Sequence, residues 1–194
     1  MAQYSPNIEN SLPALGDETA GIIHDNLGIV LTYAFSKPAL EEYRRWLTGQ
    51  RWYHSDRILR ELPEQRATRA IIELAVMFRA LDDACEITKN EWVVTHPYVV
   101  YHPTPYVYGK LYSLDGEPEP LPLREVPNKI IHANSIEWSF SGPNERRSFS
   151  TIGEPLIVCH AAGTDSRFKW TRAEVFVKAF AGVCASLSSP RGKE

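Results

Sequence analysis

The sequence predicts an α+β domain, in which a bundle of four or five helices carries short antiparallel β elements. Three observations support this fold class. Apolar residues recur at helical spacing from Ala67 to Ile87. A proline-punctuated run of β-branched and aromatic residues extends from Trp92 to Tyr112, and apolar and polar residues alternate from Ser135 to Phe140. The β elements are therefore expected before the helix near residue 128 and again before the last helix.

Composition fits one globular domain. The chain has 194 residues, of which 43% are hydrophobic and 23% are charged. We expect a flexible arm at residues 1–17, a single domain at 18–187 and a frayed tail at 188–194. The formal net charge of −3 gives no overall attraction to nucleic acid, so RNA binding would need a local basic patch. The sequence lacks a long apolar run and a signal-peptide pattern, so we expect a cytoplasmic protein with no membrane contact.

Helical signals occupy the first part of the chain. An apolar stripe predicts a helix from Glu18 to Ala34. Ser36 is expected to cap a second helix, with Pro38 in its first turn. A short helix capped by Ser55 is then expected to end at Pro63.

The longest helical stripe, from Ala67 to Ile87, predicts the central helix of the core. Arg79 and Asp83 are four residues apart, so we expect them to form a surface ion pair. The expected core positions are Ile71, Leu74, Ala75, Phe78, Leu81 and Cys85.

The β signals lie on both sides of residue 128. Residues 92–112 are expected to form an edge hairpin whose tyrosines pack or stack on bases, and residues 113–120 a loop. His96 and His102 would lie about 20 Å apart on one strand, which is too far for a shared metal ion. Residues 135–140 and 156–161 predict a second hairpin.

The last part of the chain predicts another helix. Thr171 and Glu174 have the spacing of a capping box, which predicts that a helix begins there. The apolar residues expected on its buried face are Phe176, Phe180, Val183 and Leu187.

Cysteine usage predicts free thiols. There are three cysteines, and Cys85 and Cys184 follow apolar residues at helical spacing, which is typical of core packing. Cys159 is adjacent to His160, but neighbouring residues on a strand face opposite sides. We therefore expect three reduced cysteines and no thiolate–imidazole pair.

The candidate site residues are Arg124, Asn128 and His132. Each of these residues lies four positions after the one before it. On a helix such a row drifts only about 40° per step, so the three side chains share one face. A guanidinium, an amide and an imidazole suit phosphate chemistry, because an imidazole can exchange a proton near neutral pH. Pro127 is tolerated only in a first turn, so the helix is expected to begin near Leu123 or Arg124.

The segment Leu123–Ala133 resembles the helix of HEPN-superfamily proteins that carries an arginine, a polar residue and a histidine. The resemblance implies a helical bundle, a homodimer and, in active members, a metal-independent endoribonuclease. It implies that His132 serves as general base or acid for attack by a ribose 2′-hydroxyl. Arg124 would stabilise the developing phosphorane charge, and Asn128 would orient the substrate or the imidazole.

Spacing decides between the functions that the resemblance implies. Seven residues separate Arg124 from His132, against four to six in active members, and Pro127 precedes the asparagine. This favours a module that binds RNA or a protein partner without cleaving it, and requires neither cofactor nor metal. Three alternatives remain: an endoribonuclease, a structural subunit with an exposed aromatic patch at 98–108, and an ordinary solvated helix face.

Overall fold

The computed structural model describes residues 16–47, 58, 61–89, 108–113, 117–141, 154–161 and 170–188. Within these ranges the chain is an α+β structure. The helices are α1 (Asp17–Leu47), α3 (Leu62–Cys85), α5 (Glu125–Ile131) and α6 (Val177–Ser188), with a 3₁₀ turn, η2 (Ile87–Lys89). The strands are β1 (Gly109–Tyr112), β2 (Glu119–Pro120), β3 (Ser135–Ser141), β4 (Glu154–His160) and β5 (Arg172–Phe176).

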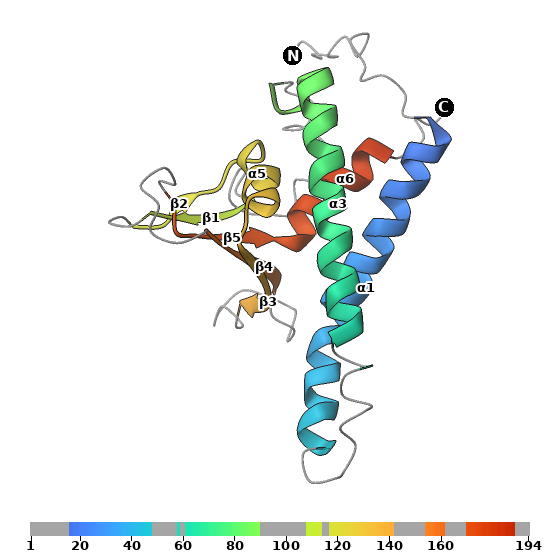
Figure 1. Cartoon of the computed structure of the whole chain (residues 1–194), viewed down its shortest axis with the longest axis vertical. Helices are drawn as coiled ribbons and strands as arrows, with labels where there is room; N and C mark the ends of the chain where they lie inside the picture. Colours follow the sequence, from blue (N-terminus) through green and yellow to red (C-terminus); the bar gives the residue numbers. More distant parts are fainter. Residues whose placement is uncertain are drawn as a thin grey trace, which may run out of the picture.

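The two long helices, α1 and α3, form a helical hairpin. Helices α1 and α3 run antiparallel, α6 packs against α1, and α5 packs against α3 on the side of the sheet (Figure 1). The strands form one antiparallel sheet in the order β2-β1-β5-β4-β3. The core therefore lies between the helices and one face of this sheet, where Ile157, Ala173 and Val175 are fully buried.

Helix α1 corrects the prediction of two separate helices. It continues without a break from Asp17 to Leu47, with Pro38 inside it. Proline removes one backbone donor from the helix, and the Ser36 hydroxyl donates to the Tyr33 carbonyl in the same turn. Tyr33 and Ala34 are buried. Tertiary packing therefore keeps the helix continuous where local propensity predicts an end.

Helix α3 confirms the predicted core stripe and corrects its start. It begins at Leu62, so Pro63 lies in its first turn instead of ending an earlier helix, and Ser55 lies outside the described residues. It ends where Glu86 adopts a left-handed conformation with φ of 51°. Of the predicted core positions, Ile71, Leu74, Ala75 and Phe78 are buried, and Leu81 and Cys85 pack partly buried against the core.

The segment Thr171–Glu174 is the clearest correction. It does not cap a helix, because Arg172–Phe176 forms strand β5, and α6 begins only at Val177. Buried Ala173 and Val175 alternate with less buried neighbours, and β5 pairs with both β1 and β4. A central strand gains hydrogen bonds on both edges, which a capped helix start here would lose.

The remaining β predictions have mixed outcomes. The hairpin of β3 and β4 is confirmed, but Glu119 and Pro120 form β2 within the expected loop. Gly109 allows the close approach of β1 to β5, since a Cβ there would lie 1.9 Å from the Glu174 carbonyl oxygen. Residues 1–15, 90–107 and 189–194 lie outside the described residues. With them lie most of the predicted arm, tail and aromatic run, and His96 and His102. The end of the aromatic run, Gly109–Tyr112, forms β1 between β2 and β5, which corrects the expected edge position.

Candidate functional site

Helix α5 holds the predicted row Arg124, Asn128 and His132. Arg124 is the residue before the helix, which confirms the predicted start, and Pro127 is buried in the first turn. His132 is the residue after the helix, and its backbone N–H donates to the Asn128 carbonyl at 3.0 Å. Arg124 and His132 therefore each lie about one helical turn from Asn128.

Exposure differs along the row. The side chains of Arg124 and His132 are exposed, whereas Asn128 is half-buried. Within the described ranges, no hydrogen bond or ion pair joins any two of these three side chains. The structure thus places Arg124 and His132 on the surface, whereas Asn128 bonds to residues outside the row.

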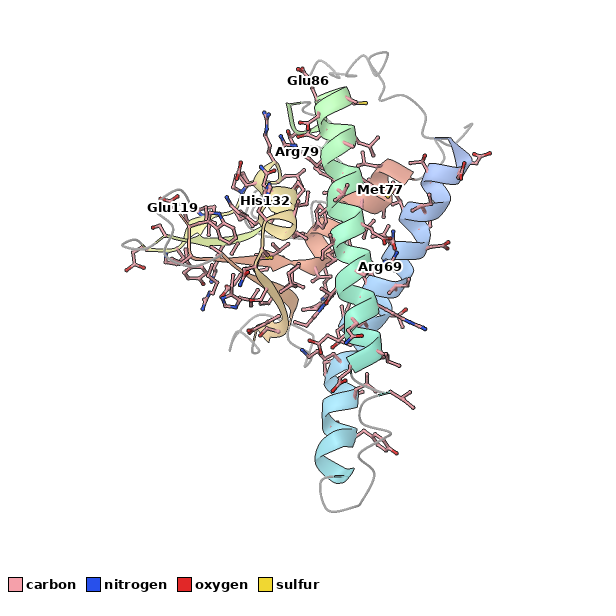
Figure 2. All side chains as sticks on the ribbon, viewed as in Figure 1. Arg69, Met77, Arg79, Glu86, Glu119 and His132 are labelled. Atoms are coloured by element: carbon pink, nitrogen blue, oxygen red, sulfur yellow. The ribbon has the colours of Figure 1, made fainter. Side chains whose placement is uncertain are left out.

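Arg79 of α3 is the partner that sequence analysis missed. Its Nη1 donates to Asn128 Oδ1 at 2.6 Å, while its Nε donates to Asp83 at 2.9 Å. The second contact is the predicted surface pair, and the first brings a guanidinium from another helix to the row (Figure 2). The two residues are 49 positions apart. Helical periodicity carries no information on a contact between two helices.

Hydrogen bonds and ion pairs keep the ionisable groups around the row in their charged forms. The hydrogen bond to Asp83 raises the pKa of Arg79, so this guanidinium remains charged. Burial tends to raise the pKa of Glu125, but the hydrogen bond from Lys129, 3.0 Å away, and the nearby charges lower it overall. Lys129 also lies over the Trp170 ring, 5.0 Å from its centroid. The charges of Asp82 and Glu125 also raise the pKa of Arg79, so three carboxylates lie close to the cations Arg79 and Lys129.

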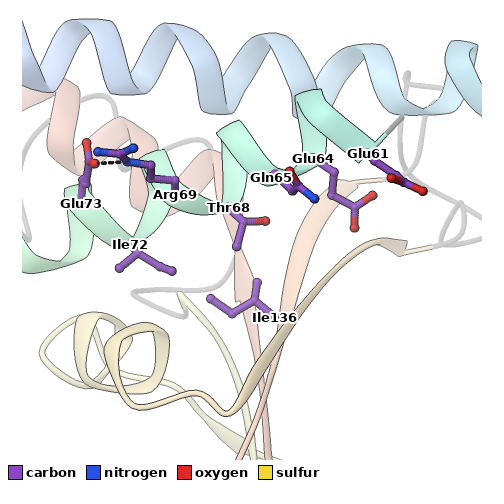
Figure 3. Close-up of a pocket in the computed structure, with 8 residues that line it drawn as sticks. All are labelled: Glu61, Glu64, Gln65, Thr68, Arg69, Ile72, Glu73 and Ile136. Carbon is purple, nitrogen blue, oxygen red and sulfur yellow. Dashed lines mark hydrogen bonds and ion pairs between the residues drawn. The ribbon is translucent and has the colours of Figure 1, made fainter. Parts of the chain in front are cut away.

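A separate groove of about 660 Å³ lies between α3 and β3 (Figure 3). It does not include the predicted row. Its lining residues are Glu61, Glu64, Gln65, Thr68, Arg69, Ile72, Glu73 and Ile136. Sequence analysis did not identify it, although the spacing of Glu61, Gln65, Thr68 and Ile72 places these four on one face of a helix.

Hydrogen bonds from buried aromatic residues hold the groove walls. The Tyr33 hydroxyl donates to Glu64 at 2.8 Å, and the Trp138 indole donates to Thr68 at 2.9 Å. Tyr33 and Trp138 meet edge to face with centroids 5.1 Å apart. The groove is therefore formed by the contact between the helices and the sheet.

None of the three cysteines lines the groove, and none forms a disulfide, as predicted. Cys159 faces the core and is fully buried, whereas His160 is only half-buried. Burial raises the pKa of Cys159 and of Cys184 to about 12. This is the opposite of an activated nucleophile.

In the part of the chain that the structure describes, no cluster of three histidine, cysteine, aspartate or glutamate residues is arranged to bind a metal ion. None of the described helices has both the length and the apolar character needed to cross a membrane. No protein-family model, curated protein or solved structure matches the chain.

Proposed function

We propose that this chain is an HEPN-like module that binds single-stranded RNA through α5 and Arg79, without cleaving it. The hydrogen bond between Arg79 and Asn128 is the observation that carries the proposal. It adds a second guanidinium to a row that already presents Arg124 and His132 to solvent. The Arg79 guanidinium is bonded about one helical turn from the exposed imidazole, and Arg124 lies about two turns from it. Such an arrangement suits contacts with phosphate and base edges.

Local charge supports a nucleic-acid ligand. The chain as a whole carries a net charge of −3, and the nearby carboxylate Asp82 is buried and accepts hydrogen bonds from Thr88. Asp83 and Glu125 each pair with a cation, Arg79 and Lys129 respectively. Arg124 adds a further charge at the surface, so this is a place where a polyanion can bind despite the acidic average.

The hydrogen bonds of the Asn128 side chain favour RNA binding over catalysis. Its Oδ1 accepts from Arg79, and its Nδ2 donates to Glu125 at 3.4 Å. An amide held in this way positions the Arg79 guanidinium and does not orient the imidazole of His132. A general base needs such orientation toward the proton that it removes.

Fluorescence anisotropy with a short labelled single-stranded RNA tests the proposal. Arg124→Ala and Arg79→Gln should each weaken binding and lower the slope of log affinity against log salt by about one. Arg69→Ala is the matched control, because Arg69 forms an equivalent pair with Glu73 on the same helix and lies away from α5.

Two outcomes would contradict the proposal. If the wild-type chain does not bind the RNA, or if Arg69→Ala weakens binding as much as Arg124→Ala, the α5 face is not the binding site. Incubation of the same RNA with wild-type protein and analysis on a denaturing gel separates binding from cleavage. Cleavage that is lost in His132→Ala would favour an endoribonuclease instead.

A further inference from the structure

The sheet face opposite the core carries a polar cluster across three neighbouring strands. In β5, Ala173 and Val175 are buried in the core, so the side chain of Arg172 lies on the opposite face. Arg172 pairs with Tyr112 of β1 and with His160 of β4. Directly paired residues of neighbouring strands lie on the same face. Arg172, Tyr112 and His160 therefore form one group, the sheet-face cluster.

The sheet-face cluster offers planar groups to a ligand. The Arg172 guanidinium lies over the Tyr112 ring, with its central carbon 4.1 Å from the ring centroid. Its Nη2 donates to Glu174 at 2.5 Å, which fixes the guanidinium in this position. The Arg172 side chain nevertheless keeps 42% of its surface exposed, and that of His160 keeps 37%. A guanidinium and an imidazole are thus accessible on adjacent strands.

Two nitrogens of the cluster have no hydrogen-bond partner among the described residues. They are Arg172 Nε and His160 Nε2, and neighbouring atoms shield both from water. Glu137 of β3 lies 3.7 Å from His160 Nε2, which is too long for a hydrogen bond. Unsatisfied polar atoms cost free energy. A ligand that stacks against these side chains and brings a polar edge to them would therefore be favoured.

The nearby carboxylates indicate which kind of ligand fits. Glu137 and Glu174 lie on either side of the cluster, at 3.7 Å from His160 and 2.5 Å from Arg172. Both would repel a phosphate or a carboxylate, but both can accept hydrogen bonds from N–H groups. A nucleobase is planar and uncharged, and its edges carry both acceptors and N–H donors. Unpaired RNA bases also stack on imidazole rings and on guanidinium planes.

We propose that the sheet-face cluster binds an unstacked base of the RNA strand that contacts α5. This inference rests on the proposed function. Ser135 begins β3 and pairs with His160, and it follows His132 by three residues. Three residues span at most about 11 Å, so the end of α5 and the cluster lie at the same end of the sheet. A strand that contacts His132 can pass over this end and place a base on the cluster.

Anisotropy titrations of the full chain with two labelled oligonucleotides test the inference. One is a short single-stranded RNA, and the other is the same ribose-phosphate backbone without bases. Wild type should bind the RNA about tenfold more tightly, because stacking adds to the backbone contacts. Arg172→Lys keeps the charge but lacks the planar guanidinium, so it should lose most of this preference. Arg69→Lys is the matched control, since Arg69 also pairs with a glutamate but lies on α3, and it should keep the preference.

Arg124→Ala separates this inference from the α5 proposal. It should weaken binding of both oligonucleotides equally, because it removes a phosphate contact and leaves the sheet-face cluster intact. Equal affinity of the wild type for the two probes would overturn the base site and leave the α5 proposal standing. An unchanged preference in Arg172→Lys would do the same. If neither probe binds to the wild type, both proposals fail.

Thermal melts check that each variant folds. If Arg172→Lys does not fold, His160→Ala is measured in its place, because it removes the neighbouring imidazole from the same cluster. The expected result is again a loss of the preference for RNA over the backbone without bases. A folded His160→Ala protein that keeps the full preference would overturn the inference.

Discussion

The Phe78 ring of α3 meets the Phe180 ring of α6 edge to face, with centroids 5.7 Å apart. Both side chains are fully enclosed, with 1% and 0% of their surface exposed. This contact joins the long helical hairpin to the last helix, and so to strand β5 that precedes it. The aromatic pair is therefore central to the core.

Replacing Phe78 with alanine should lower the free energy of unfolding by about 3–5 kcal/mol, because a large cavity replaces a buried ring. Urea denaturation measures the loss. Val76→Ala is the control, since Val76 is on the same helix with 50% of its surface exposed, and its effect should stay within about 0.5 kcal/mol. A Phe78→Ala midpoint near that of the control would contradict the assigned core.

The core stripe of α3 was predictable because helical periodicity is local information. Strand β5 was not predictable in this way. The spacing of Thr171 and Glu174 fits a capping box, and the alternation of Ala173 and Val175 fits a strand equally well. Pairing with β1, about 60 residues earlier, decides between them. Such long-range contacts are invisible to a local pattern.

The candidate site likewise has some features that the local sequence predicts and others that depend on long-range contacts. The start of α5 and the position of Pro127 followed from backbone chemistry, because proline is favoured in the first turn, where a helical N–H has no partner. Arg79 could be paired with Asp83 by spacing, but its contact with Asn128 depends on how two helices pack. The groove depends likewise on the contact between α3 and β3.

Gly109→Ala should destabilise the sheet by about 1–3 kcal/mol or more, because overpacking forces strands apart. The new Cβ would lie 1.9 Å from the Glu174 carbonyl oxygen, so β1 and β5 would have to separate. Gly28→Ala is the opposite case: nothing lies within 4 Å of its added Cβ on α1. Removing glycine from a helix should there stabilise the protein by up to about 1 kcal/mol. Equal melting temperatures for the two variants would contradict the close approach.

Cysteine labelling should distinguish the three thiols. The pKa values of Cys159 and Cys184 are raised to about 12 by burial, so these thiols should resist iodoacetamide at pH near 8 in the native protein. Cys85 is only half-buried and should be modified first. Mass spectrometry should show one added group under native conditions and three after denaturation. Rapid native labelling of Cys159 would show that β4 does not face the core.

Acid should remove the contribution of Glu125 to stability. Its pKa in the folded protein is lowered from the usual 4.5, so its interactions stabilise the protein above that pH. The stabilisation is lost as the pH falls through the lowered folded value. Wild type should therefore exceed Glu125→Gln in stability at neutral pH, and the difference should close below about pH 4.5. Urea midpoints across this range test the sign, and a difference that grows on acidification would contradict it.

His132→Ala should affect binding far more than folding. The side chain is exposed, and exposed substitutions usually change stability by about 0.5 kcal/mol or less. Because His132 follows the last residue of α5, loss of a favourable interaction with the helix dipole would add only about 0.3–1 kcal/mol. The variant should melt close to wild type yet bind single-stranded RNA more weakly. Parallel thermal melts and anisotropy titrations separate the two effects. A stability loss of several kcal/mol would show that the imidazole is structural, and unchanged RNA affinity would remove it from the binding face.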